Sequence, residues 1–195
     1  MNYRIFALLT LLSGCGSGTQ KSGNPHIEIQ TQYGDIEIEL YPKKAPKSVT
    51  AFLGYIDAGY FKNCSFYRVL NEENQPTGAA ETALIQGGLW KTDTDTGRQI
   101  PTILHESTRQ TGLLHQNGTL SLARQAPGTA STEFFICIGN QPLFDYGGAT
   151  GADSVGYAAF GQVVKGMGVV NKIHHRTVDG ELFAPHIFIR NIVRL

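Results

Sequence analysis

The chain has 195 residues, of which 41% are hydrophobic and 16% charged, so it can bury a core and is neither disordered nor a coiled coil. Sixteen Lys and Arg balance sixteen Asp and Glu without a basic run, which argues against a nucleic-acid partner. The length indicates one folded domain, and its 23 glycines, with many β-branched and aromatic residues, favour short strands over long helices.

Residues 1–15 have the pattern of an export signal, because a short positive start precedes an apolar run too short to span a bilayer. The last four of them, Leu12-Ser13-Gly14-Cys15, resemble the lipobox of bacterial lipoproteins, in which the cysteine thiol receives a diacylglycerol. An ordinary signal with a chance cysteine is the alternative. Residues 16–25 have the composition of a flexible tether. We therefore expect residues 26–195 to be anchored in the cell envelope through acyl chains on Cys15, on the periplasmic side of the outer or inner membrane.

The hydrophobic pattern of residues 26–195 predicts short strands and two helices. Alternating apolar residues indicate a half-buried hairpin over residues 26–41, and Pro46 opens a helix that ends at Gly59. The other expected elements are strands at 65–70, 84–87, 118–123, 133–138 and 158–163, a helix at 166–174 and a final alternating segment at 186–195. About eight short strands with a helix near each end of the chain fit a closed antiparallel barrel with capped mouths.

Five local motifs follow one another along this part of the chain. They are Phe66-Tyr67-Arg68-Val69, Ile85-Gln86-Gly87-Gly88, Leu120-Ser121-Leu122-Ala123, Ser131-Thr132-Glu133-Phe134-Phe135-Ile136-Cys137 and Gly156-Tyr157-Ala158-Ala159-Phe160-Gly161. In this order they resemble the cyclophilin family of peptidyl-prolyl isomerases, over about residues 27–195. The resemblance implies a mainly β, closed eight-stranded barrel that isomerises Xaa-Pro bonds without a cofactor. With the export signal, it predicts an enzyme that assists the folding of exported or envelope proteins.

Rotation about an Xaa-Pro bond breaks no bond and needs no nucleophile, but it must overcome a barrier of about 18–20 kcal/mol. A guanidinium can donate a hydrogen bond to the prolyl nitrogen once its lone pair localises. The resemblance gives this role to Arg68, for which a surface arginine is the alternative. It makes Gln86 an anchor for Arg68 and for a substrate carbonyl, whereas a purely structural bridge is the alternative.

The resemblance also implies a groove for proline-containing polypeptides. Alternation along the strand sends Phe135 toward the groove and Phe134 to the opposite face. Ala123 and Arg124 match a strand edge that pairs with an extended peptide. The remaining implied pocket and rim residues are Leu84, Ala83, Leu143, Phe144 and Tyr157.

Some positions depart from the family pattern. Residues 71–80 form an insertion expected to be a surface loop beside the groove. Ala83 stands where a pocket Phe is common, Leu143 where a Trp or Phe is usual, and Glu133 where a Gln is frequent. The sequence therefore predicts a wider and less aromatic pocket.

The remaining cysteines and histidines do not suggest a metal site. Cys64 and Cys137 are expected to be free thiols, Cys137 as a small buried residue in an apolar run. The adjacent His174 and His175 lack a Cys or His partner at ligand spacing, so we expect them to be solvated and no metal to bind.

Two other classes of function stay open. The loss of pocket aromatics would suit a chaperone that holds proline-containing segments in the same groove without isomerising them. A structural lipoprotein with only the shape of the family would be expected to lack Arg68 or Gln86, and both are present. A hydrolase is not supported, because no Ser or Cys lies in a recognisable nucleophile elbow. We expect a monomer.

Overall fold

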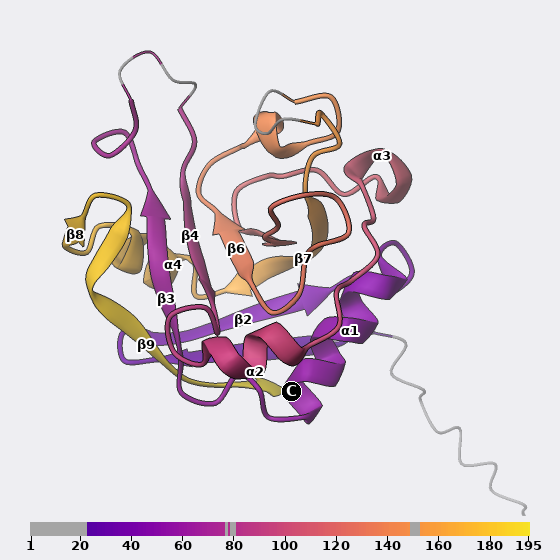
Figure 1. The fold of residues 1–195 in the computed structure, drawn as a ribbon, viewed down its shortest axis with the longest axis horizontal. Coiled ribbons are helices and arrows are strands. Elements are labelled where there is room, and N and C mark those ends of the chain that lie inside the picture. Colours follow the sequence, from indigo (N-terminus) through magenta and orange to yellow (C-terminus); the bar gives the residue numbers. More distant parts are fainter. Residues whose placement is uncertain (1–22, 77, 79–80, 149–152) are drawn as a thin grey trace, which may run out of the picture.

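The computed structural model describes residues 23–76, 78, 81–148 and 153–195 (Figure 1). The predicted signal, Cys15 and most of the tether therefore lie outside the described residues, and these predictions stay untested. The first described residues enter β1 beside the C-terminal end of the chain, because the Leu195 N–H donates to the His26 carbonyl at 3.0 Å.

A closed antiparallel barrel forms the body of the domain. The strands are β1 (His26–Thr31), β2 (Gly34–Leu40), β3 (Cys64–Leu70), β4 (Leu84–Gly88), β5 (Thr119–Leu122), β6 (Phe134–Cys137), β7 (Ala158–Lys165), β8 (Val178–Asp179) and β9 (Leu182–Arg194). Their order is β1-β2-β7-β5-β6-β4-β3-β9, and β1 also pairs with β9, which closes the sheet. The predicted eight-stranded barrel is confirmed, and β8 is an extra strand paired with β9.

The two predicted helices are present, and the structure adds short ones. The helix α1 (Pro46–Asp57) contacts β7 and β9, and α4 (Met167–His174) contacts β2 and β4. The sequence pattern missed α2 (Thr94–Gln99), α3 (Thr108–Thr111) and the 3₁₀ turn η1 (Pro142–Phe144), which are too short to show an apolar period. None of the helices in the described part of the chain has the length and apolar character needed to cross a membrane.

Alternation along the strands separates the interior of the barrel from a second apolar cluster. Phe134 and Ile136 of β6 belong to the main core, whereas Phe135 and Cys137 belong to the smaller cluster. The predicted division between Phe134 and Phe135 is therefore confirmed. This division follows from the two-residue repeat of a strand, which needs no long-range information.

His174 is buried, so the prediction that both adjacent histidines are solvated is wrong for this one. Only 8% of its surface is exposed, and its Nε2 donates to the Leu70 carbonyl at 2.9 Å. Burial lowers the pKa of His174. His175 is exposed, because adjacent residues of a helix point in different directions.

Cys64 and Cys137 are both free, as predicted, and the predicted burial of Cys137 is confirmed. Cys64 is fully buried as well. Burial raises the pKa of both thiols, that of Cys64 to about 12. Since the thiolate is the reactive form, both side chains act as small apolar residues of the core.

Candidate active site

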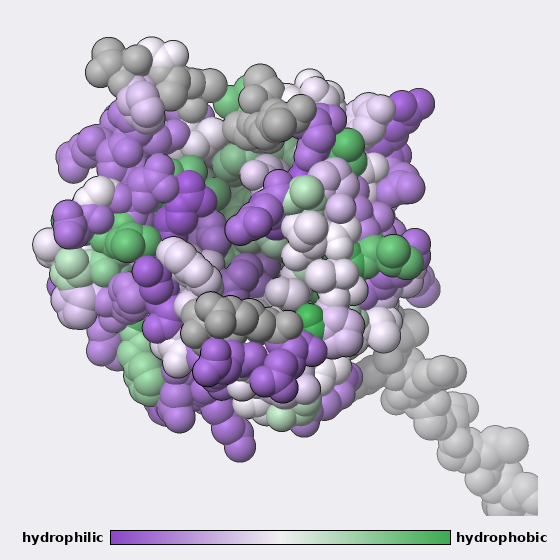
Figure 2. All heavy atoms as spheres, viewed as in Figure 1, coloured by the Kyte–Doolittle hydropathy of each residue, from purple (hydrophilic) through white to green (hydrophobic). Residues whose placement is uncertain are grey.

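A groove of about 680 Å³ lies on the outer side of β3, β4 and β6, and Figure 2 shows this face of the molecule hollowed. Most of the site residues predicted from the sequence line it. They are Arg68, Leu84, Gln86, Ala123, Arg124, Phe135, Phe144 and Tyr157. Segments that lie far apart in the sequence therefore meet at one surface, as the family resemblance implied.

Aromatic rings and a leucine form the apolar wall of the groove. Phe135 contacts Phe144 and Tyr157 edge to face, with ring centroids 5.3 and 5.4 Å apart. Phe135 and Phe144 are almost fully buried, and Leu84 belongs to the same cluster. Edge-to-face packing fixes the ring directions, so the wall is a preformed surface for a compact apolar group.

A β-bulge in β3 brings two consecutive side chains to the groove. Phe66 pairs with Gly87 and Arg68 pairs with Gln86, so Tyr67 is an extra residue opposite β4. Because the bulge interrupts the alternation, Tyr67 and Arg68 both line the groove while Phe66 stays in the barrel core.

The Arg68 guanidinium is held from two sides. Its Nε donates to Glu181 at 2.8 Å, and its Nη1 donates to Gln86 at 3.0 Å. The Arg68 side chain remains 32% exposed. Among the residues that the structure describes, none accepts a hydrogen bond from its Nη2. The guanidinium is therefore oriented and still has donors for a ligand.

Tyr67 and Glu133 form a second polar layer that sequence reasoning did not identify as part of the site. Gln86 Nε2 donates to the Tyr67 hydroxyl at 2.7 Å, and this hydroxyl donates to Glu133 at 2.5 Å. Burial raises the pKa of Glu133, and burial together with the nearby carboxylate raises the pKa of Tyr67. The only signal in the sequence was the replacement of a frequent Gln by Glu133.

Glu181 was also missed, because it lies 113 residues from Arg68 in the sequence. It follows Gly180, whose positive φ of 60° turns the chain between β8 and β9. The Val69 N–H donates to the Glu181 carbonyl at 2.9 Å, which fixes this turn beside β3. The turn between β8 and β9 thus places the Glu181 carboxylate beside Arg68.

Arg124 lines the groove, but its side chain is committed to the protein. Its Nη1 and Nη2 donate to Asp153 at 2.8 and 2.9 Å, and its Nη2 also donates to the Gly156 carbonyl. The hydrogen bonds from Arg124 lower the pKa of Asp153 to about 2. Arg124 therefore holds the segment before Tyr157 against the groove.

Ala83 and Leu143, both predicted to contribute to the pocket, do not line the groove. Ala83 precedes Leu84 in β4 and so points to the other face, and its carbonyl accepts from the Ile138 N–H at 2.9 Å. Leu143 lies in η1, where successive side chains diverge by about 120°, so only Phe144 reaches the groove. The predictions for these two side chains are corrected accordingly.

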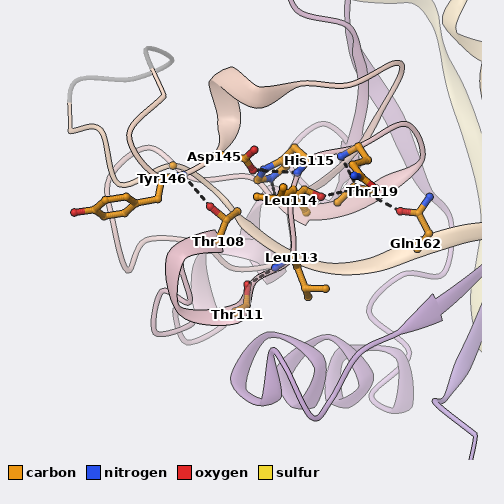
Figure 3. Close-up of polar contacts among 12 residues, drawn as sticks. Thr108, Thr111, Leu113, Leu114, His115, Thr119, Asp145, Tyr146 and Gln162 are labelled. Carbon is orange, nitrogen blue, oxygen red and sulfur yellow. Dashed lines mark hydrogen bonds and ion pairs between the residues drawn. The ribbon is translucent and has the colours of Figure 1, made fainter.

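His115 forms a buried polar cluster behind the apolar wall (Figure 3). Its Nδ1 lies 2.8 Å from Asp145 and its Nε2 lies 2.9 Å from the Ser121 hydroxyl. The His115 ring stacks on Phe135, with centroids 5.9 Å apart. Ser121, His115 and Asp145 thus form a series of contacts like that of a catalytic triad. Ser121 has no exposed surface, however, so it cannot meet a substrate. The cluster supports the wall of the groove.

The described part of the 71–80 insertion is tied down at its base. Asn74 Nδ2 donates to the carbonyls of Val69 and Gly180, and Gln75 exchanges hydrogen bonds with Thr82, which lines the groove. The described start of the insertion therefore lies beside a residue of the groove, in agreement with the predicted position of this loop. Within the described residues, no group of three or more His, Cys, Asp or Glu side chains is arranged to hold a metal ion.

Comparison with known proteins agrees with this geometry. The family model described as cyclophilin type peptidyl-prolyl cis-trans isomerase/CLD matches residues 26–193. A peptidyl-prolyl cis-trans isomerase of Acinetobacter baylyi is 34% identical over 84% of this chain and 79% of its own length. Peptidyl-prolyl cis-trans isomerase B of Escherichia coli is 34% identical over 75% of this chain and 82% of its own length.

A solved structure supports the same fold. The chain resembles a cyclophilin type peptidyl-prolyl cis-trans isomerase of Cryptosporidium parvum with a TM-score of 0.67 and 24% identity, over 88% of this chain and 97% of that one. The Cryptosporidium protein has also been solved in the presence of the dipeptide Ala-Pro. The barrel, the groove and the relatives together assign the chain to the cyclophilin-type peptidyl-prolyl cis-trans isomerases.

Proposed function

We propose that the groove binds a proline-containing segment of an exported or envelope protein, and that Arg68 and Gln86 catalyse rotation about its Xaa-Pro bond. The observation that carries this proposal is the Arg68 guanidinium, held by Gln86 and Glu181 beside an apolar wall of Leu84 and Phe135. The dipeptide used with the Cryptosporidium relative supports a proline ligand for this class of groove.

The chemistry follows from what each group offers to a twisted amide. Burial of the pyrrolidine ring against Phe135, Leu84 and Phe144 positions the bond. As the amide twists, the lone pair returns to the prolyl nitrogen and becomes an acceptor for a donor that is already oriented, here Arg68. The side-chain carbonyl of Gln86 accepts a hydrogen bond from the Arg68 guanidinium and so holds it in place. Each 1.36 kcal/mol by which these contacts favour the twisted amide over the planar one gives about tenfold in rate.

The proposed site of action is the cell envelope. The lipobox-like Leu12-Ser13-Gly14-Cys15 and the tether-like residues 16–25 support a lipid anchor on Cys15. The acyl chains would hold the domain on the periplasmic side of a membrane, where exported chains with Xaa-Pro bonds are still folding. We propose a monomeric enzyme, because residues of a single chain form the whole described lining of the groove.

The test is cis-trans exchange of a short Xaa-Pro peptide, followed by NMR with the full chain in mild detergent and no added metal or cofactor. We expect exchange well above the uncatalysed rate, whose timescale is about 10–100 s. Peptide binding without faster exchange would instead support the non-catalytic chaperone. If the peptide shows no binding and no faster exchange, the proposed role of the groove is contradicted.

A further inference from the structure

The hydrogen bonds behind Arg68 all run in one direction. Arg68 Nη1 donates to Gln86 Oε1 at 3.0 Å, Gln86 Nε2 donates to Tyr67 Oη at 2.7 Å, and Tyr67 Oη donates to Glu133 Oε2 at 2.5 Å. Each link is therefore both an acceptor from the previous group and a donor to the next. The chain of donors begins at the guanidinium and ends at a carboxylate.

The Glu133 carboxylate occupies a site that is built for it. Its Oε1 accepts from the Leu89 and Trp90 N–H groups at 2.9 and 3.1 Å and from the Thr132 hydroxyl at 3.1 Å. Gly88 makes this approach possible, because a Cβ at that position would lie 2.5 Å from Glu133 Oε2. With φ at +143°, Gly88 also has a backbone conformation that side chains with a Cβ rarely adopt.

An ionised carboxylate determines which way every link points. It can only accept hydrogen bonds, so Tyr67 must donate to it. The Tyr67 oxygen then accepts from the NH₂ group of Gln86. The amide is thereby oriented with its carbonyl oxygen toward Arg68, which has only donors to offer. A neutral residue at position 133 would not impose this direction.

We propose that Glu133 and Tyr67 are positioning residues for catalysis, and that the charge of Glu133 orients Gln86 so that its carbonyl holds Arg68. This inference rests on the proposed role of Arg68 as the donor to the prolyl nitrogen. Both residues line the groove, and their hydrogen bonds assign them an indirect effect on the reacting bond. Their effect reaches it through the amide of Gln86, and the geometry of all three contacts carries the proposal.

Protonation of Glu133 reverses the chain. A carboxylic acid donates to the Tyr67 oxygen, the Tyr67 O–H then requires the Gln86 carbonyl as its acceptor, and the amide turns its NH₂ group toward Arg68. Two donors then face each other and the hydrogen bond to Arg68 is lost. Active enzyme therefore has ionised Glu133, and turnover falls as the pH drops through the pKa of this carboxyl.

Several groups surround Glu133 and act on its protonation. Burial raises its pKa above the ordinary value of 4.5, while hydrogen bonds from Tyr67, Thr132 and the backbone oppose this rise. The Cys64 thiol also lies near enough for the Glu133 carboxylate to raise the pKa of the thiol. Arg68 is the nearby cation, at the other end of the hydrogen-bonded series that runs through Gln86 and Tyr67. Lys91 lies over the ring of Trp90 and is the cation on the adjacent segment.

The experiment measures kcat and KM for one Xaa-Pro peptide against pH, using the full chain and variants shown by circular dichroism to be folded. We expect Glu133→Gln to lower kcat about tenfold, which corresponds to one hydrogen bond, with little change in KM. It should also abolish the loss of turnover toward acid. Tyr67→Phe interrupts the same series of hydrogen bonds and is expected to show both effects, the lower kcat and the absence of a fall in turnover toward acid. The double variant should be no slower than Tyr67→Phe alone.

Two controls make the result specific. Glu106→Gln makes the same chemical change at a buried carboxylate that contacts α1 rather than the groove, and it should retain the acid limb and kcat. Glu133→Asp keeps the negative charge, so its turnover should still fall toward acid pH, and it should retain part of the wild-type kcat. Wild-type kcat and pH profile in folded Glu133→Gln or Tyr67→Phe would overturn the inference. Normal turnover in Arg68→Ala would instead overturn the proposed role of Arg68.

Discussion

At the scale of single residues, the two arginines of the groove, Arg124 and Arg68, differ in how completely their donors are already paired within the protein. Arg124 makes a bidentate ion pair with Asp153 and has only 4% of its side chain exposed, so it serves the structure of the groove wall. Arg68 has a single bond to each of two partners and remains partly exposed. The difference in pairing, which the residue type alone does not reveal, separates the structural arginine from the proposed catalytic one.

Arg68→Ala is expected to lower turnover by about 10²–10³, as for the loss of one preorganised donor to a transition state. Arg68→Lys should restore little, since an ammonium cannot span Gln86 and Glu181 in the planar geometry of a guanidinium. NMR exchange on a short Xaa-Pro peptide measures both. The thermal unfolding transition should stay near that of the wild type, and its collapse would make Arg68 structural instead.

His174 is expected to make the fold less stable in acid. Burial lowers its pKa below the ordinary value of 6.5, so the unfolded chain takes up a proton at a higher pH than the folded chain. The free energy of unfolding should therefore fall as the pH decreases from about 6.5 toward the folded-state pKa of His174.

Urea titrations of His174→Gln at several pH values measure this contribution, and the variant should lose part of the acid dependence. His175→Gln, one residue further along, changes an exposed side chain and should keep most of it. An identical acid dependence in the wild type and His174→Gln would contradict the assignment to this residue.

At the scale of elements, α1 depends on a carboxylate from a distant segment. The residue before the helix is Ala45, which cannot cap it with a side chain. Glu106 instead accepts from the N–H groups of Lys47 and Ser48 at 3.1 and 2.8 Å and from the Ser48 hydroxyl at 2.8 Å. The negative charge also lies at the positive end of the helix dipole. The segment between β4 and β5 is thus attached to the helix that covers the barrel.

Glu106→Ala is therefore expected to lower the free energy of unfolding by roughly 1–2 kcal/mol, the effect of removing a good helix cap. Denaturant titration measures the change. Glu106→Gln keeps an acceptor for the same N–H groups and should cost less. Equal losses for the two variants would show that packing rather than capping is responsible.

At the scale of the whole molecule, the strand pairs that close the barrel join the two ends of the domain. The chain belongs to an enzyme family, whereas its proposed location in the cell rests only on the sequence of the residues before β1. The lipid anchor proposed at Cys15 and the catalytic groove therefore make independent predictions.

Cys15→Ser is expected to give an exported protein without lipid, because Cys15 is the only thiol in residues 1–25. Growth with a clickable fatty acid, followed by gel fluorescence, should label the wild type and leave the variant unlabelled. Isomerase activity of the two forms should be equal. Fatty-acid labelling of Cys15→Ser would contradict the assignment of the anchor.

The sequence predicts those features that depend on local periodicity or on a matching motif. Strand alternation separates Phe134 from Phe135 correctly, and the motifs that contain Arg68 and Gln86 do meet at one groove. The bulge at Tyr67 leaves no local mark, because it exists only relative to the pairing with β4. Glu181 was missed for a similar reason, since contacts between distant segments depend on how the barrel closes.

One consequence of the closure concerns mechanical load. The strand β1 is paired along both edges, with β2 and with β9. A pull transmitted through the residues before His26 runs along this strand, so it shears both ladders at once and their bonds resist together instead of unzipping singly. With a lipid on Cys15, the drag of a client chain in the groove reaches the membrane through β1. The domain would then be tethered by a strand that is hydrogen-bonded to a neighbour along each of its edges, so that its extraction breaks both ladders simultaneously.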